Sequence, residues 1–219
     1  MNALKLHGFA ASNYYNKVKL ALIEKEIVFE EVLQWADGSP PLLASSPLGK
    51  IPYLETEHGF ISETQAINEY LEAQFPERPL MPADAFEAAK VREITAFADL
   101  YLDWEARRTY GWAFFGGAPD EAVNQQVLAR LEKAVPALMK LVRLSPFAAG
   151  PTFTLADCAL AVHLPLVGLA AKLALGRDLY AGMPLKDYIA MIGERPSVQR
   201  VNADRKVNSE LMLSARAKR

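Results

Sequence analysis

The sequence predicts a small α/β domain followed by an all-helical domain, on the evidence of two observations. Over residues 1–77, short apolar segments follow one another in the order strand, helix, strand, irregular link, strand, strand, helix. This order fits a compact α/β domain with a mixed sheet. Three prolines then fall between positions 76 and 82, and every later apolar segment has helical spacing. We therefore take residues 78–88 as a linker into an all-helical domain over 89–219.

The α/β domain is predicted segment by segment from its apolar pattern. Residues 3–7 alternate as a strand does, and Val18 and Leu22 give the next helix its buried stripe. The link over 34–49 holds three prolines and two glycines, so we expect a loop with at most a short helix. The predicted strands lie at 3–7, 27–33, 51–54 and 60–61, and the predicted helices at about 14–26 and 64–71.

The second domain is predicted to contain two long helices and then a buried one. Gly116–Pro119 separates the first long helix from the second, which Pro136 should kink because proline removes a backbone donor. Thr154 and Asp157 have the spacing of a capping box, with Asp in place of the usual Glu. The helix that follows is apolar on all sides except at His163, so we expect it to be buried.

Composition and charge narrow the class of protein. The 219 residues are 51% hydrophobic and carry a net charge of −2, so no broad basic field invites nucleic acid or an anionic membrane. Cys158 is the single cysteine, which excludes an intrachain disulfide and suits a reducing compartment. His7, His58 and His163 lack ligand spacing, so no metal is expected. Because Asn13–Lys17 interrupts any secretory signal and we find no 18-residue apolar stretch, we expect a cytoplasmic globular protein.

The segment 46–71 carries the strongest motif, SPLGKIPYLETEHGFISETQAINEYL. A turn leads into a short apolar strand that contains Pro52, although proline cannot donate to a sheet ladder. A cis Ile51–Pro52 bond is one way to keep it, because the backbone groups of Ile51 then turn outward to meet something other than a strand. Gly59 allows the next turn. The hydroxyl and free N–H groups at the following helix start form an anion site.

Two motifs in this segment give the sequence its family resemblance. Gly49–Pro52 (GKIP) is followed, about a dozen residues later, by Glu63–Ile67 (ETQAI). In this order they resemble the motifs of the cytosolic glutathione S-transferases, here of the bacterial serine type, with Thr64 where the family more often has Ser. The Thr154–Asp157 box and the run Arg195–Val201 also match, so the resemblance covers nearly the whole chain.

The resemblance implies a thioredoxin-like glutathione-binding domain and a helical domain that supplies a pocket for an electrophile. The expected protein is a glutathione transferase acting in detoxification, a cytoplasmic homodimer that uses glutathione as co-substrate and no metal. The thiolate of the bound glutathione would attack a small hydrophobic electrophile. Neither nucleic acid nor a membrane is an expected partner. A glutathione-dependent isomerase or peroxidase on the same site is an alternative enzyme. A non-catalytic binding member is an alternative of another class, because fold does not fix function.

Ser12 is the catalytic residue that the resemblance implies. A free thiol with a pKa of about 8.5 is mostly protonated at neutral pH. A hydroxyl at a helix N-terminus stabilises the thiolate, and the family places this hydroxyl in the loop after the first strand. Tyr14 is the runner-up, whereas tyrosine-dependent classes would need tyrosine at His7 and cysteine-dependent classes a cysteine near position 12. The plainer alternative for Ser12 is a helix N-cap.

A second group of residues is implied in glutathione binding. Glu63 and Thr64 would hold the γ-glutamyl end, and the main chain of Ile51 would pair with the cysteinyl unit. Lys50 would approach the glycyl carboxylate. Taken alone, Glu63 fits better as a helix-start acid and Lys50 as a solvated loop charge, and only the joint pattern favours glutathione. The implied set is Gln34, Lys50, Ile51, Pro52, Glu63 and Thr64.

An aromatic cluster late in the first long helix is the candidate electrophile pocket. Facing the thiol, these side chains would form an apolar surface of the kind that binds small molecules. Packing in the core or in a dimer is the equally open alternative for each one. The residues are Tyr101, Trp104, Tyr110, Trp112 and Phe115.

Overall fold

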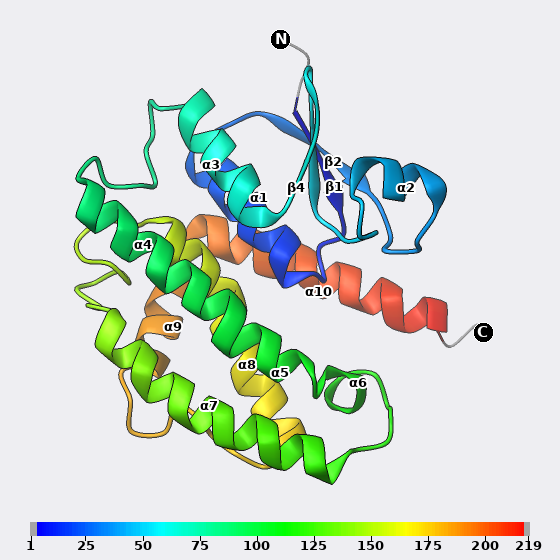
Figure 1. The fold of residues 1–219 in the computed structure, drawn as a ribbon, viewed down its shortest axis with the longest axis vertical. Coiled ribbons are helices and arrows are strands. Elements are labelled where there is room, and N and C mark those ends of the chain that lie inside the picture. Colours follow the sequence, from blue (N-terminus) through cyan, green and yellow to red (C-terminus); the bar gives the residue numbers. More distant parts are fainter. Residues whose placement is uncertain (1–3, 217–219) are drawn as a thin grey trace. The chain divides into compact units, whose positions relative to one another are not determined.

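The computed structural model describes residues 4–216, with side chains described to residue 210, and the chain folds into two compact units. The first unit combines the chain up to Leu80 with the segment from Arg195 onward, and the second is Met81–Glu194 (Figure 1). The unit boundary at Leu80 lies within the predicted linker. The C-terminal segment was expected with the helical domain, whereas here it groups with the α/β unit.

The first unit has a four-stranded mixed sheet in the order β2-β1-β3-β4. Strands β1 and β2 are parallel, whereas β3 is antiparallel to both β1 and β4. Its elements are β1 (Leu4–Gly8), α1 (Asn13–Glu24), β2 (Phe29–Leu33), α2 (Pro40–Ser45), β3 (Tyr53–Thr56), β4 (Gly59–Ser62), α3 (Thr64–Gln74) and α10 (Pro196–Arg216). The predicted βαβ-ββα order is confirmed, with α2 as the short helix in the proline-rich link.

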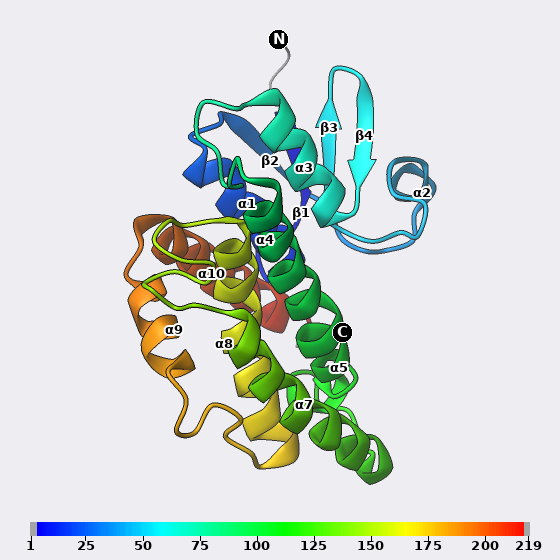
Figure 2. The ribbon, with the colours of Figure 1, turned by 60° about the vertical axis from the view of Figure 1, so that its left-hand side comes forward.

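The core of this unit lies between the sheet and helices α1 and α3. Leu6 and Leu54 of the central strands meet Val18 of α1 and Ile67 and Leu71 of α3, and all five are fully buried. The spacing of apolar residues in the sequence therefore indicates correctly which face of each element is buried. Figures 1 and 2 show α1 and α3 on one side of the sheet and α2 on the other.

Helix α10 is held to the first unit by charged hydrogen bonds. The Glu24 carboxylate accepts two hydrogen bonds of 2.7 Å from the Arg195 guanidinium. Such a bidentate, charge-assisted pair is stronger than a hydrogen bond between neutral groups. The Lys19 ammonium, whose side chain is 1% exposed, lies 2.6 Å from Glu31 and 2.7 Å from Asp204. Because a buried ammonium depends on its partners, these contacts link α10 to both α1 and β2.

The second unit is helical throughout its regular structure. Its elements are α4 (Ala85–Phe97), η1 (Ala98–Asp103), α5 (Trp104–Arg107), α6 (Tyr110–Ala113), α7 (Glu121–Leu141), α8 (Leu155–Leu175) and α9 (Leu185–Gly193). The first predicted long helix is interrupted by η1, a six-residue π-helix. Such a turn re-aims the side chains that it carries, and Asp99 and Asp103 both lie on it.

Helix α8 is the central helix of this unit. It has 21 residues and a mean hydropathy of 1.9 over its most apolar window, so it is long and apolar enough to cross a membrane. The prediction that no apolar stretch reaches 18 residues was therefore wrong. However, 61% of that window is buried inside the protein, as in a core helix, which agrees with the predicted burial.

The Asp157 carboxylate is the polar centre of the α8 N-terminus. It completes the predicted capping box by accepting from the Thr154 N–H at 2.8 Å, and it also accepts the Thr154 hydroxyl at 3.0 Å. Two further donors were not foreseen: the Ala148 N–H at 2.7 Å and the Tyr188 hydroxyl at 2.8 Å. A box predicted as a local cap thus joins three segments of the chain.

His163 of α8 forms a buried charged cluster with the π-helix. Its Nε2 lies 2.9 Å from Asp99 Oδ1 and its Nδ1 lies 3.7 Å from Asp103 Oδ1. Burial alone lowers the pKa of His163, but the bonds and charges of Asp103 and Asp99 outweigh it, so the pKa is raised. Burial raises the pKa of Asp103, yet His163 and Arg107 bring it below its usual range.

This cluster predicts a pH dependence of stability. The folded state keeps the His163 proton to a higher pH than the unfolded chain does, so its contribution is complete below about pH 6.5 and is lost as the pH rises through the raised pKa. We expect the free energy of unfolding, measured with urea between about pH 6 and 9, to fall more steeply in wild type than in His163→Gln. His58→Gln, at an exposed histidine, is the matched control and should keep the wild-type slope. Parallel profiles for wild type and His163→Gln would contradict this account.

Candidate active site

Ser12 lies at the N-terminus of α1, immediately after the loop that follows β1. Its Oγ accepts the Tyr15 N–H at 3.3 Å, and its backbone is extended, with φ −79° and ψ 123°. The residue is therefore the N-cap of α1, which was the plainer alternative. The two roles are compatible, because a hydroxyl that accepts a hydrogen bond still has its own hydrogen to donate. Ser12 is half-exposed, so a ligand can reach it.

Two asparagines fix the loop before Ser12 through hydrogen bonds to its main chain. Asn16 of α1 donates from Nδ2 to the Ala10 carbonyl at 2.8 Å. Asn208 of α10 accepts the Ala11 N–H at 3.0 Å. Neither residue was predicted from the sequence, and nothing local could have indicated Asn208, which is 197 positions from its partner. The loop that positions Ser12 is thus fixed partly by the C-terminal helix.

The two tyrosines of α1 have different surroundings. The Tyr15 hydroxyl is buried and donates to Glu31 at 2.7 Å, and burial raises its pKa far above the usual range. Tyr14 is half-exposed, with the Lys17 ammonium 5.3 Å from its ring centroid. Tyr14 therefore stays the runner-up for thiol activation. His7, at the position where a tyrosine was considered, stacks on Tyr53 with ring centroids 4.4 Å apart.

The strand directions bring the candidate glutathione residues to one edge of the sheet. Strands β1 and β4 run the same way because both are antiparallel to β3. The chain therefore leaves β1 toward Ser12, and β4 toward Glu63 and Thr64, at the same edge. Strand β3 begins at this edge, where Tyr53 pairs with His7, so Pro52 belongs there too. Two helix N-termini thus start at one edge, an arrangement that favours anionic groups.

The turn into α3 has an unusual backbone. Glu63 has φ +68°, a region that non-glycine residues rarely adopt and that is often found at functional sites. Its carbonyl accepts the Ile67 N–H at 3.0 Å, and its side chain is exposed. Thr64 begins α3 and is buried. Both residues were expected at this helix start, but this conformation was not.

The remaining candidates of the first unit surround the start of β3. The Ile51–Pro52 bond is cis, as predicted, Pro52 is buried, and Ile51 is half-buried. Lys50 is exposed on the link before β3. Gln34 follows β2, where its N–H donates to the Gly8 carbonyl at 3.0 Å and its Nε2 to the Trp35 carbonyl at 2.8 Å. The side-chain amide is therefore oriented by the backbone.

The five aromatic residues of the second unit fall into two groups. Tyr101 and Trp104 are each 55% exposed and Phe115 is 49% exposed, so three of the rings are accessible. Tyr110 is buried, with its hydroxyl donating to Asp103 at 2.9 Å. Trp112 is half-buried and donates from Nε1 to Asn124 at 3.1 Å. Their closeness in the sequence did not distinguish these surroundings.

Comparisons of the sequence and of the fold with known proteins agree on one family. Residues 6–79 match the family model for the N-terminal domain of glutathione S-transferases. The chain is 41% identical over 206 residues to a glutathione S-transferase of Pseudomonas putida strain F1, covering 94% of each chain. It is 29% identical over 217 residues to FtsZ-localized protein A of Caulobacter vibrioides, covering 91% of each. A solved maleyl pyruvate isomerase, described as a bacterial zeta-class transferase, superposes with a TM-score of 0.71 at 26% identity, covering 90% of this chain and 95% of the other.

Proposed function

Because this chain belongs to the glutathione S-transferase family, we propose that it ionises bound glutathione for attack on a small hydrophobic electrophile. The observation that carries the proposal is the common sheet edge at which Ser12, Pro52 and Thr64 lie. A tripeptide with two carboxylates and a thiol fits an edge where two helices begin. The proposal includes the cytoplasmic homodimer and the detoxification role that the sequence resemblance implies.

In this proposal the Ser12 hydroxyl donates a hydrogen bond to the glutathione sulfur. The thiol releases its proton to water, and the N-terminus of α1 further stabilises the thiolate. Lowering the thiol pKa by about two units corresponds to about 2.7 kcal/mol of differential stabilisation. The sulfur then either forms a bond to the electrophilic carbon as the leaving group departs, or adds to an activated double bond whose other carbon takes up a proton from water. Fixing the thiolate beside its target provides the remaining acceleration.

The other candidate residues position the two substrates. Thr64 and Glu63 bind the γ-glutamyl end at the start of α3, and the main chain of Ile51, before Pro52, pairs with the cysteinyl unit. The glycyl carboxylate is bound by Lys50, with help from Gln34. Accessible aromatic side chains support an apolar surface for the electrophile, and the exposure of three of them favours this role. The proposed set stays Tyr101, Trp104, Tyr110, Trp112 and Phe115.

Retention on immobilised glutathione, followed by turnover assays, tests the proposal. We expect elution with free glutathione and conjugation of at least one aryl halide or enone in a panel. Retention with isomerisation or peroxide reduction, but without conjugation, would favour the alternative enzyme, a class represented by the maleyl pyruvate isomerase. Failure to bind glutathione would favour a non-catalytic binding protein.

Asn208 is expected to position the catalytic loop without touching substrate. Removing its bond to the Ala11 N–H in Asn208→Ala costs about 0.5–1.5 kcal/mol of loop ordering, so kcat should fall roughly two- to tenfold. The KM for glutathione should stay nearly constant, since its anchors lie elsewhere. Asn208→Asp, which keeps an acceptor, should recover most of kcat.

Asn202→Ala is the matched control, because Asn202 is exposed on the same helix. It should leave both kinetic constants at wild-type values. An equal loss of kcat in the two alanine variants would mean that α10 stability matters rather than the bond to Ala11.

A further inference from the structure

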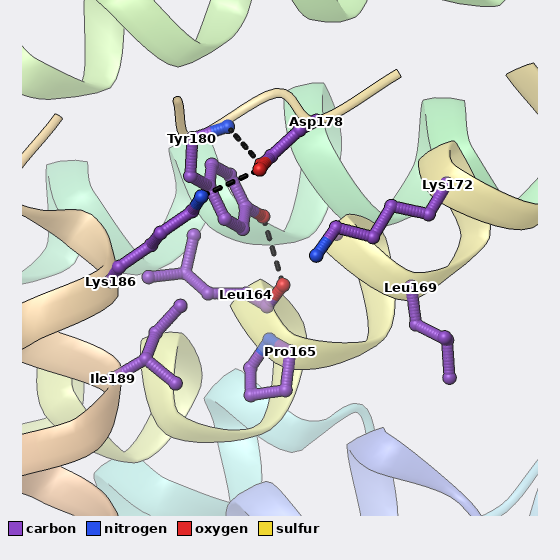
Figure 3. A pocket seen from close by; sticks show the side chains of 9 residues that line it. Leu164, Pro165, Leu169, Lys172, Asp178, Tyr180, Lys186 and Ile189 are labelled. Carbon is purple, nitrogen blue, oxygen red and sulfur yellow. Dashed lines mark hydrogen bonds and ion pairs between the residues drawn. The ribbon is translucent and has the colours of Figure 1, made fainter. Parts of the chain in front are cut away.

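A pocket of about 260 Å³ lies in the second unit between α8, α9 and the segment that connects them (Figure 3). All of its lining residues fall between positions 164 and 189. It therefore shares no residue with the candidate glutathione site or with the aromatic set. The proposed transferase chemistry makes no use of it.

The walls of the pocket are mainly apolar. Leu164, Pro165 and Leu169 come from α8 and Ile189 from α9. Leu169 is 48% exposed although most of α8 is buried, so this apolar side chain is available to a ligand. Figure 3 shows Pro165 and Ile189 below the ring of Tyr180, and Leu169 at the lower right, directed away from that ring. An apolar ligand that binds here would remove its surface from water, which favours binding.

The far wall is a fixed aromatic ring. The Tyr180 hydroxyl donates to the Leu164 carbonyl at 2.9 Å, which anchors the ring against α8. Gly168 makes this approach possible, because a Cβ built there would lie 2.8 Å from the ring edge. The pocket is therefore preformed by a specific contact, as small-molecule sites commonly are.

The rim of the pocket has a net positive charge. The Lys186 ammonium pairs with Asp178 at 2.5 Å, and Asp178 also accepts the Tyr180 N–H at 3.3 Å. Lys172 has no carboxylate within 4 Å among the residues that the structure describes. Figure 3 shows its ammonium extending over the pocket. The two lysines and one aspartate that face the space thus leave one ammonium available to an anion.

We propose that this pocket binds a small apolar carboxylate, with its hydrocarbon part on Pro165 and Ile189 and its carboxylate at Lys172. The charge of the rim selects an anion over a cation, and the apolar walls select against phosphate or sugar. The volume is just below the range of about 300–1,000 Å³ that suits drug-sized ligands, so it matches one fused aromatic ring system or a medium-length alkyl chain. The inference is independent of the proposed transferase activity.

Calorimetric titration of the full-length protein tests the ligand class. The probes are 1-naphthoate, neutral 1-naphthamide, cationic 1-naphthylmethylamine and, as the alkyl carboxylate, octanoate. We expect the naphthoate to bind more tightly than the amide and the amine to bind weakest. Saturating glutathione should leave naphthoate binding unchanged. Equal affinity for the three naphthyl probes, or displacement by glutathione, would overturn the proposal.

Three variants test the location. Lys172→Gln should weaken naphthoate binding roughly two- to fivefold, the size of one exposed charge pair, and leave the amide unchanged. Asp178→Asn should strengthen naphthoate binding by a similar factor, because it removes a repelling carboxylate and releases Lys186. Lys133→Gln, at an exposed lysine of α7, is the matched control and should match wild type. Equal weakening in both lysine variants, or no gain in Asp178→Asn, would contradict binding in this pocket.

Discussion

Replacing Ser12 with alanine is expected to lower turnover at neutral pH on the order of 10²-fold, while glutathione affinity changes only a few-fold. The loss corresponds to about 2.7 kcal/mol of thiolate stabilisation. Binding should persist because the proposed anchors at Lys50, Ile51 and Thr64 are untouched. Ultraviolet titration of bound glutathione should show a raised thiol pKa, and raising the pH should recover much of the lost rate.

Ser12 is also the N-cap of α1, so the variant needs structural controls. Loss of the cap is worth about 1 kcal/mol, and unfolding measurements separate this cost from the catalytic one. Ser12→Thr keeps both cap and hydroxyl and should keep the low thiol pKa. If Tyr14→Phe raises the thiol pKa and Ser12→Ala does not, Tyr14 is the activator. If neither variant changes it, the helix dipole and backbone N–H groups suffice.

Replacing Asp157 with alanine is expected to lower the free energy of unfolding by about 3 kcal/mol or more. Four donors from Ala148, Thr154 and Tyr188 would lose their acceptor in the interior of the second unit. A buried donor without a partner costs about 1–3 kcal/mol, although such losses do not add fully. Chemical denaturation followed by circular dichroism measures the change.

Asp120 offers a matched comparison for Asp157. Its carboxylate caps α7 through a single bond of 3.0 Å to the Val123 N–H and is exposed. Asp120→Ala should therefore cost only about 1 kcal/mol. Similar losses in the two variants would mean that Asp157 is merely a cap. Activity per folded molecule should survive Asp157→Ala, and a specific loss of turnover at normal stability would place Asp157 in the active site.

Local patterns predicted most of the α/β unit, because its strands and helices bury residues at their own regular spacing. Val18, Leu54 and Ile67 are buried where the spacing placed them. The antiparallel pairing of β3 with β4 follows from the same pattern combined with the turn at Gly59. The order of elements was therefore accessible from local spacing, whereas the residues at the sheet edge were indicated by the family resemblance.

Features that depend on distant partners were not accessible. Asn208 has no local signal, because its function is a bond to a loop near the other end of the chain. Tyr110 and Trp104 belong to the same aromatic run, yet one is buried against Asp103 and the other is exposed. Trp104 follows the π-helix, whereas Tyr110 begins α6 beyond the end of α5, and hydrophobic spacing does not encode such irregularities.

The return of α10 to the first unit determines when that unit can be completed during protein synthesis. Residues up to Leu80 leave the ribosome first, but Glu24 and Lys19 have partners at Arg195 and Asp204. Protein synthesis proceeds at about 5–20 residues per second, so Arg195 and Asp204 are added several seconds after Leu80, once the whole of the second unit has been made. The helical unit, by contrast, is contiguous in sequence, from Met81 to Glu194. The unit that begins the chain is consequently the last to be finished, and a nascent chain that stops before Arg195 carries the proposed catalytic serine on an unfinished scaffold.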